Sequence, residues 1–526
     1  MTPENDNHKH ARVLFIGWDG AEPRIVNPLL ASSRLPNLAA LIRQGFIAPL
    51  PSTIRPESPT AWTTFATATN PGTHGVYGFM RQIAHSYSYE FTNSNHVRVP
   101  FFWETLSLHG KRVALLNMPM AYPPRPVNGW LVCGLMTPDS DSPFTYPAKL
   151  GRELIKQGYT IDAEPLEFGE ERGSYVEKMH RQVRQRVVTA KDLLRNMDWD
   201  FGAVVFTELD RLQHFFWADM DAQHPLHPTE VYTNAIGDHY VELDRALGEL
   251  VSMVGPDTLV ILMSDHGFAP CAQRFYINAW LVQQGYIKIT GTFGNNKSRL
   301  VKLISWAKKQ GVLRRVKRSI VGTASVVRQM ESHFYNQQVD WQHTRAWFAD
   351  TEGIRVNLYG REPQGVVREG NEYNNLLTEL SDKLLNIYDP KTHSKVIKAV
   401  YHNRDIYTGP ELDLSPDLIV EPFRNFDNLN DNYWIESQHY GNYQTLYESS
   451  APYSANHSSN GVCASNAMPP FPIKGIDDVS RWIMNYCGVD VDPVITRYDT
   501  RSDTNAFDAQ SEQHLSERLR KLGYID

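Results

Sequence analysis

Seven side chains that can bind a metal ion or act as a nucleophile lie where predicted strands or helices end. Two of these places are alike, because an apolar run over 13–18 ends in Asp19 and another over 259–263 is followed by Asp265 and His266. Carboxylates and imidazoles are ligands for divalent cations. The pattern predicts two metal sites that share one nucleophile, built from these residues: Asp19, Ser58, Asp210, His214, Asp265, His266 and His457.

Asp210 and His214 are four residues apart, which places both on one face of a helical turn. This spacing alone is common in structural helices. Here a strand-like run over 204–209 precedes Asp210, and aromatic residues at 215–217 follow His214. We therefore expect Asp210 at the carboxyl end of a strand, beside a dry pocket that binds one cation strongly.

The nucleophile hypothesis depends on Ser58, which precedes Pro59 at the predicted start of a helix. A helix amino terminus offers free N–H groups to an alkoxide or a phosphate. Ser58 is predicted to be the N-cap, so capping alone is the alternative explanation for it. A serine hydroxyl needs a base or a metal ion to become a good nucleophile, and no Gly-x-Ser-x-Gly turn surrounds Ser58. Metal activation is the consistent solution.

The elements that must position these residues alternate between strand-like and helical patterns. The strand-like runs are 13–18, 112–118, 130–135, 201–207 and 259–263, and helical patterns cover 35–44 and 175–197. This alternation predicts an α/β fold with a doubly wound, mostly parallel sheet sandwiched by helices. In such sheets ligands bind outside the carboxyl ends of the strands, where Asp19, Asp210 and Asp265 fall.

A basic, helix-prone stretch between about 291 and 343 interrupts this alternation. We expect a first core part over 1–290, an inserted helical cap over 291–343, and a core completion over 344–526 that carries His457. A solvated basic face is the simpler interpretation of the insertion, and a membrane-surface helix is the alternative. The polar, aromatic segment 425–447 is a candidate cover for a leaving group, or a surface loop.

The order of motifs along the chain resembles the alkaline phosphatase superfamily, and within it the type I phosphodiesterase/nucleotide pyrophosphatase group. The motifs are Gly17-Trp18-Asp19-Gly20, Ser58-Pro59-Thr60-Ala61-Trp62, Asn70-Pro71-Gly72-Thr73-His74-Gly75, Asp210-x-x-x-His214, Ser264-Asp265-His266-Gly267 and the late His457. The resemblance extends from about residue 11 to Tyr524. It implies an alkaline-phosphatase-like fold and, aligned on Pro71, a catalytic serine at Ser58.

The resemblance also implies how the metal ligands divide. One ion would have these ligands: Asp210, His214 and His457. The other would have these ligands, with Ser58 in contact: Asp19, Asp265 and His266. His457 departs from the family pattern in one respect, because Ala455 stands where a glycine is often found.

The activity implied is hydrolysis of a small-molecule phosphoester through a phosphoserine at Ser58 and two divalent metal ions. The mixed ligands favour zinc, with manganese or iron as alternatives. Nucleotide pyrophosphatases of the superfamily carry an asparagine three residues after the nucleophile, where this chain has Ala61. Phosphodiesterase activity of the nucleotide pyrophosphatase type is the first hypothesis. Phosphomonoester hydrolysis, or phosphoryl transfer on a specialised metabolite, is the alternative.

Two further classes fit the sequence less well. A sulfatase would need an arginine four residues after the nucleophile, where this chain has Trp62. A scaffold without activity would require that the ligand set fail to converge. A cationic group for a second phosphate charge has no assigned residue, although Arg55 and Arg211 are close in the chain to the predicted site.

Composition agrees with a large enzyme. The chain has 526 residues, a formal net charge of −7 and a hydrophobic share of 41%, so no nucleic-acid polymer is expected as a partner. The four cysteines are far apart, which favours buried free thiols over a metal site or a disulfide framework. No apolar leader or membrane-length run is seen, so a cytoplasmic location is expected. The oligomeric state stays open.

Overall fold

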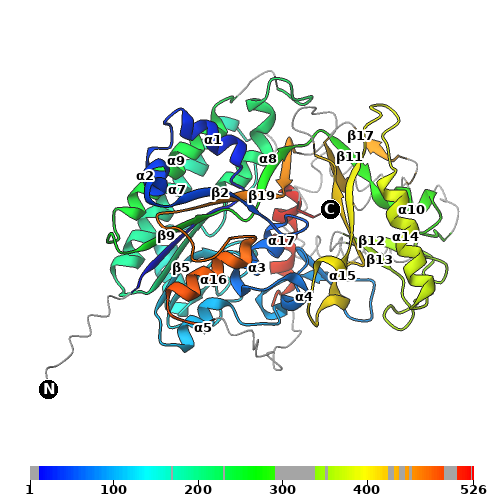
Figure 1. The fold of residues 1–526 in the computed structure, drawn as a ribbon, viewed down its shortest axis with the longest axis horizontal. Coiled ribbons are helices and arrows are strands. Elements are labelled where there is room, and N and C mark those ends of the chain that lie inside the picture. Colours follow the sequence, from blue (N-terminus) through cyan, green and yellow to red (C-terminus); the bar gives the residue numbers. More distant parts are fainter. Residues whose placement is uncertain are drawn as a thin grey trace, which may run out of the picture.

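The structure, a computed structural model, describes residues 11–166, 170–228, 232–290, 338–349, 353–424, 432–436, 443, 445–448, 453–490, 506–522 and 524–525. These residues form a large unit around an eight-stranded sheet and a smaller unit around a four-stranded sheet, each with its own hydrophobic core. The smaller unit lies on the right in Figure 1. The predicted α/β fold, with a mostly parallel sheet between helices, is confirmed.

The large sheet has a parallel centre and antiparallel edges. In sheet order the parallel strands are β9 (Leu259–Met263), β1 (Val13–Trp18), β8 (Phe201–Phe206), β5 (Val113–Met118) and β6 (Gly129–Cys133). The antiparallel edge strands are β19 (Asn460–Ser465) and β2 (Phe46–Pro51) beyond β9, and β7 (Thr145–Tyr146) beyond β6. The five strand-like runs predicted from the sequence are the five parallel strands, with ends shifted by at most two residues.

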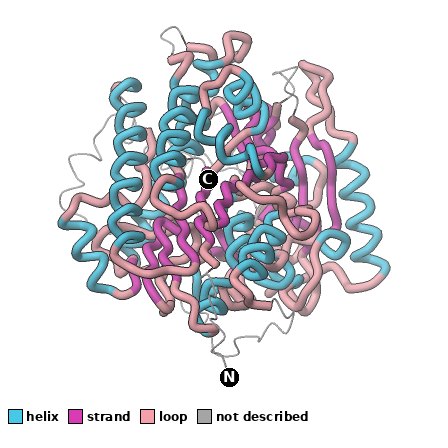
Figure 2. The backbone as a smooth tube through the Cα atoms, turned by 60° about the vertical axis from the view of Figure 1, so that its left-hand side comes forward, coloured by secondary structure: helices cyan, strands magenta, loops and turns pink. Residues whose placement is uncertain are grey.

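Helices cover both faces of this sheet, as Figure 2 shows. One face carries α1 (Pro23–Ala31), α2 (Pro36–Leu41), α7 (Arg172–Arg195), α8 (Glu208–Met220) and α9 (Ala235–Val251). The other carries α3 (Ser58–Thr67), α4 (Pro71–His74), α5 (Phe102–Leu108) and α16 (Ile476–Tyr486). The predicted helix over 35–44 is α2 followed by a 3-10 turn, η1 (Ile42–Gln44), and that over 175–197 is α7.

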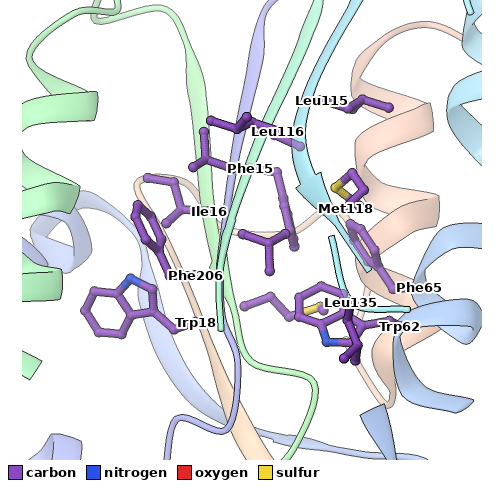
Figure 3. Close-up of a cluster of buried hydrophobic side chains, with 14 of the residues drawn as sticks. Phe15, Ile16, Trp18, Trp62, Phe65, Leu115, Leu116, Met118, Leu135 and Phe206 are labelled. Carbon is purple, nitrogen blue, oxygen red and sulfur yellow. The ribbon is translucent and has the colours of Figure 1, made fainter. Parts of the chain in front are cut away.

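Strand β1 illustrates why the sheet is buried on both sides. Every residue of β1 is buried, which fits a parallel strand between two helical layers. Phe15 stacks on Phe65 of α3 with ring centroids 4.4 Å apart, whereas Trp18 meets Tyr240 of α9 edge to face at 6.3 Å. Figure 3 shows Trp18 and Phe65 on opposite sides of the central strands. The apolar run is therefore fixed from both faces, and it delivers Asp19 at its end.

The smaller unit is antiparallel. Its sheet has the order β12 (Ala346–Ala349), β13 (Gly353–Val356), β15 (Leu418–Pro422) and β14 (Ile397–His402), and α10 (Ile277–Gln283) and α14 (Asn371–Leu385) contribute to the same core. A three-stranded sheet of β16 (Tyr433–Glu436), β11 (Gln273–Tyr276) and β17 (Tyr447–Glu448) adjoins it. The predicted boundaries at 290 and 343 stay a prediction, because residues 291–337, and with them most of the proposed cap, lie outside the described residues.

Several short elements complete the chain. They are β3 (Met80–Gln82) with β4 (Tyr89–Phe91), β10 (Gly267–Pro270) with β18 (Ala455–Ser458), η2 (Ser94–His96), α6 (Ala148–Lys156), α15 (Asn403–Ile406), η3 (Leu412–Leu414) and α17 (Ala509–Lys521). The four cysteines are buried and free, as predicted. None of the helices in the described ranges has the length and apolar character needed to cross a membrane.

Candidate active site

Three adjacent strands of the large sheet deliver the carboxylates of the site. Asp19 follows β1, Asp265 follows β9, and Asp210 lies in the first turn of α8, directly after β8. Because β9, β1 and β8 are neighbours and parallel, their carboxyl ends meet at one edge. All three carboxylates are buried. The structure therefore places them where the sequence predicted a ligand crevice.

The histidines reach this edge from three different elements. His266 follows Asp265, His214 lies one turn after Asp210 on α8, and His457 lies on β18 opposite Phe268 of β10. Antiparallel pairing with β10 holds His457 in a short ribbon. This pairing stacks the His457 ring on the His266 ring, with centroids 3.7 Å apart.

The ligand atoms have the separations that a shared cation requires. Asp210 Oδ2 lies 3.3 Å from Nε2 of His214 and 3.3 Å from Nε2 of His457. A tetrahedral ion with bonds of about 2.0–2.1 Å keeps its ligand atoms about 3.3–3.4 Å apart. Asp210, His214 and His457 therefore form a group that can hold a metal ion.

A second group lies beside the first. His266 Nε2 is 3.3 Å from Asp265 Oδ2 and 3.6 Å from Asp19 Oδ1. Ligand atoms of Asp19, His266 and Asp210 also lie within 4.8 Å of one another. Asp210 is thus close to both groups, so the two predicted ligand sets are adjacent in space.

Each histidine is oriented by a backbone carbonyl at its Nδ1 atom. The distances from Nδ1 to the carbonyl oxygen are 2.9 Å for His214 to Ala455, 3.1 Å for His266 to Gly267 and 2.9 Å for His457 to Pro56. A carbonyl only accepts, so Nδ1 carries the hydrogen and donates it, which leaves Nε2 with a free lone pair. All three Nε2 atoms are thereby prepared as metal ligands.

The atoms left without a hydrogen-bond partner coincide with the expected ligand atoms. In the described part of the chain they include five buried atoms of this site: Asp19 Oδ1, Asp210 Oδ2, Asp265 Oδ2, His214 Nε2 and His457 Nε2. Buried polar atoms without partners are costly and call for an explanation. A pair of divalent cations would satisfy all five, so the residues fit the metal ions that the resemblance implies.

The pKa values of the three carboxylates also indicate a site that fits cations. Burial, together with the neighbouring carboxylates, raises the pKa of Asp19 and of Asp265 well above the usual range. Burial would also raise the pKa of Asp210, but His214, His457 and Arg211 together hold it well below its usual value. Carboxylates this close repel one another unless a cation compensates their charge.

Ser58 is the first residue of α3, and its hydroxyl is directed at the second group. Its Oγ is buried and lies 3.1 Å from His266 Nε2. The prediction that Ser58 is the N-cap is wrong, because the extended residue is Glu57 (φ −101°, ψ 132°) and Ser58 is already helical. The Glu57 side chain makes no capping hydrogen bond to α3. The Ser58 hydroxyl is therefore not used as a cap.

Hydrogen bonds from neighbouring residues orient the carboxylates. The Trp62 indole nitrogen donates to Asp19 Oδ2 at 3.0 Å, and the Gly20 amide donates to Asp265 Oδ1 at 3.3 Å. In each case one carboxylate oxygen is held and the other remains without a hydrogen bond. Such outer contacts fix the direction of a ligand and influence metal affinity.

One contact to Asp210 comes from the far end of the chain. The Tyr524 hydroxyl bonds Asp210 Oδ1, and its ring lies 5.6 Å from the His214 ring. Arg211, considered above as a substrate contact, is instead buried in bonds to Asp210, Asp162 and Tyr524. No local pattern marks Tyr524, because it is more than 300 residues from Asp210 in the chain.

His74, from the motif that followed Ser58, has a structural position. The Val76 amide donates to His74 Nδ1 at 3.1 Å, and Nε2 lies 3.0 Å from Thr64 Oγ1 on α3. Burial lowers the pKa of His74 to about 3, so it stays neutral. The motif therefore stabilises the helix that presents Ser58 and does not supply a ligand. Most of the segment 425–447 lies outside the described residues.

The fold and these paired ligand groups are those of an enzyme that hydrolyses phosphoester bonds. The chain belongs to the type I phosphodiesterase/nucleotide pyrophosphatase family, whose model matches residues 13–439. A comparison with curated proteins finds no match by sequence.

Solved structures share the fold at low sequence identity. Phosphonoacetate hydrolase from Sinorhizobium meliloti 1021, in complex with phosphonoformate, has 12% identity and a TM-score of 0.56, over 91% of this chain and 96% of that chain. The same enzyme in complex with phosphonoacetate gives a TM-score of 0.52 at 12% identity and the same coverage. Human ectonucleotide pyrophosphatase/phosphodiesterase 5 has 11% identity and a TM-score of 0.46, over 92% of this chain and 96% of that chain.

Proposed function

We propose that the chain hydrolyses small-molecule phosphodiesters through a phosphoserine at Ser58, with two divalent metal ions bound at the carboxyl edge of the large sheet. The observation that carries this proposal is the convergence of five unpaired ligand atoms beside a buried serine hydroxyl. Family membership supports phosphoester hydrolysis as the reaction.

The ligands would divide into two sets. The first set is Asp210, His214 and His457, and the second is Asp19, Asp265 and His266, with Ser58 adjacent. Zinc is proposed because imidazole and carboxylate ligands at these separations suit it, while manganese and iron accept the same ligands. When bound, the two ions would lower the pKa of the Ser58 hydroxyl and of a water molecule and would withdraw charge from the entering and leaving oxygens.

Ser58 Oγ would then attack phosphorus in line with the leaving oxygen. The Oγ–P bond forms as the bond from phosphorus to the leaving alkoxide breaks. The intermediate is a phosphoserine that still carries the second ester substituent, and the proton lost by Ser58 is balanced on the departing alkoxide, which leaves as an alcohol. A water molecule then attacks phosphorus from the vacated side, the Oγ–P bond breaks, a phosphomonoester is released, and a proton from the water restores the Ser58 hydroxyl. Two in-line displacements give net retention of configuration at phosphorus.

The position of Ala61 supports phosphomonoesters as a second candidate substrate class. Ala61 is fully buried in α3, one turn from Ser58, so no amide group is available there to hold a phosphoryl oxygen. The chain therefore lacks a contact typical of nucleotide pyrophosphatases. The diester hypothesis is preferred because it is the activity of the family to which the chain belongs.

A paired assay tests the proposal. Zinc-loaded protein is given bis-p-nitrophenyl phosphate and p-nitrophenyl phosphate, with and without chelator, alongside Ser58→Ala. We expect faster cleavage of the diester, loss of activity with chelator and loss of activity in Ser58→Ala. Preference for the monoester would favour the second candidate. Chelator-resistant or Ser58-independent hydrolysis would contradict the mechanism.

A further inference from the structure

A cleft between the two units lies directly beside the ligand groups. It is partly open to solvent. Its lining comes from the large unit through Arg55, Glu57, Asn456 and Tyr524, and from the other side through Pro422, Arg424, Trp434 and Ile435.

Three of these residues connect the cleft to the proposed reaction centre. Tyr524 bonds Asp210, and its ring lies 5.7 Å from the His457 ring. Glu57 precedes Ser58, and its Oε2 lies 3.9 Å from His457 Nδ1. Asn456 precedes His457 on β18. A substrate whose phosphorus is at Ser58 would therefore have its remaining part within reach of this cleft.

Arg424 brings a positive charge to the far wall. Its Nη1 donates to the Tyr433 carbonyl at 2.5 Å, it also interacts with the Cys271 thiol, and its buried Nε has no hydrogen-bond partner. Neither of these partners is a carboxylate, and Arg424 forms no ion pair within the described ranges. A guanidinium has five N–H donors, so donors remain for a ligand.

Arg55 brings a second positive charge from the near wall. Its backbone is in the left-handed region, with φ of 27°, a costly conformation for a residue with a side chain. Its Nη2 lies 3.5 Å from Glu57 Oε1, so one carboxylate in the cleft partly compensates it. The lining of the cleft thus contains two guanidinium groups and one carboxylate.

We infer that Arg424, assisted by Arg55, binds a second anionic group of the substrate, a carboxylate or a phosphate, remote from the phosphorus that reacts. This inference rests on the proposed function for the position of the reacting phosphorus. Planar guanidinium groups bind carboxylate and phosphate through paired hydrogen bonds. The substrate class is therefore a small phosphoester with an additional anionic group, and esters without such a group should bind more weakly.

Binding of phosphonates tests this subsite without turnover of a phosphoester. The probes are propylphosphonate, 3-phosphonopropionate and propane-1,3-diyl bisphosphonate, titrated by calorimetry into the zinc-loaded full-length protein. We expect at least one of the two probes with a second anionic group to bind about 10- to 100-fold more tightly than propylphosphonate. The carboxylate and bisphosphonate arms show which group is preferred.

Variants of the two arginines locate the effect. In Arg424→Gln the affinity ratio should fall to near one, and Arg424→Lys should keep part of it because the charge remains. Arg55→Gln should reduce the ratio less, since Glu57 already faces Arg55. Arg345→Gln is the matched control, because Arg345 is part-exposed and does not line the cleft. Melting temperatures show whether Arg424→Gln and Arg424→Lys are equally folded.

The outcomes separate this inference from the proposed function. Equal affinity for all probes, no binding of any probe, or an affinity ratio that Arg424→Gln leaves intact would overturn the subsite. Hydrolysis of bis-p-nitrophenyl phosphate that depends on Ser58 would still support the proposed function in those cases. Conversely, an Arg424-dependent ratio without Ser58-dependent hydrolysis would keep the subsite and refute the mechanism.

Discussion

Two groups of neighbouring histidines in the large unit differ in their polar surroundings. At the sheet edge, the Nδ1 atoms of three histidines face carbonyl oxygens and their Nε2 atoms lie near carboxylates. Between α7 and α9, His180 and His239 stack with centroids 5.2 Å apart. Neither nitrogen of His239 has a hydrogen-bond partner in the described part of the chain, and no ion pair is recorded there for either ring.

The difference shows what makes a candidate metal site. Proximity of imidazoles is present in both groups, and burial lowers the pKa of His239 as it does for His266. At the sheet edge, buried carboxylate oxygens lie 3.3 Å from the Nε2 atoms and the rings have fixed orientations, which together create a negative pocket lined by lone pairs. The helix pair provides two neutral rings that pack against each other.

The largest expected effect is on catalysis, which we assign only to the group at the sheet edge. Ser58→Ala should reduce kcat by at least about 10³-fold because the nucleophile is lost, while bound metal remains. Hydrolysis of bis-p-nitrophenyl phosphate and metal content by mass spectrometry measure the two effects. Ser32→Ala, on an exposed helix end, is the control. Full activity in Ser58→Ala would show that the hydroxyl is not the nucleophile.

Metal content provides the most direct test of the difference between the groups. His214→Ala should lower the bound zinc from about two ions per chain to about one, since three protein ligands per ion leave no substitute. His239→Leu, of similar volume, should leave the zinc content unchanged. Zinc loss in both variants, or in neither, would show that the two histidine groups do not differ as metal sites.

Tyr524→Phe tests whether a hydrogen bond from outside the ligand set orients Asp210. Without the hydroxyl bond to Asp210 Oδ1, zinc affinity should fall by about 10- to 100-fold, as for other outer contacts of metal sites. Competition with a chromogenic chelator measures this affinity. Tyr486→Phe, whose hydroxyl donates to the Asp257 carbonyl at 3.1 Å, is the control and should bind zinc normally. An unchanged affinity in Tyr524→Phe would mean that Arg211 alone orients Asp210.

The burial of His239 between α7 and α9 should make the folded protein less stable at low pH. Burial lowers the pKa of His239 well below 6.5, so the unfolded chain takes up a proton at a higher pH than the folded chain. The free energy of unfolding should therefore fall as the pH drops below 6.5, by at most about 1.4 kcal/mol per pH unit. In His239→Leu this part of the loss should disappear.

Urea midpoints at about pH 7.5 and about pH 5.5, for wild type and His239→Leu, measure this difference. His74 contributes equally to both proteins, so the difference reports His239 together with its stacked neighbour His180. Parallel pH profiles would show that His239 is protonated at no cost in the folded chain.

The parallel centre of the fold could be predicted because its signals are local. Each of β1, β8 and β9 is an unbroken apolar run, since both faces of the strand are covered. The antiparallel strands of the smaller unit are short and less uniform, and the pairing of β19 with both β2 and β9 depends on long-range register. Such pairing has no local signal.

In the candidate site, too, some features have a local sequence signal and others depend on long-range contacts. Asp19, Asp210 and Asp265 follow predictable strands, so their convergence could be expected. The orientation of His457 depends on β10 and the Pro56 carbonyl, and the role of Tyr524 depends on a contact across the whole chain. The N-cap error at Ser58 was a shift of one residue, which a sequence pattern does not resolve.

The distribution of the ligand groups along the chain also has a kinetic consequence. The Gly20 amide and the Asp265 carboxylate are 245 residues apart, and His214 and the Ala455 carbonyl are 241 residues apart. Contacts of such long range form late in folding, after large loops have closed. Zinc uptake during refolding should therefore coincide with the final, slowest phase, so the metal can report the completion of the native topology.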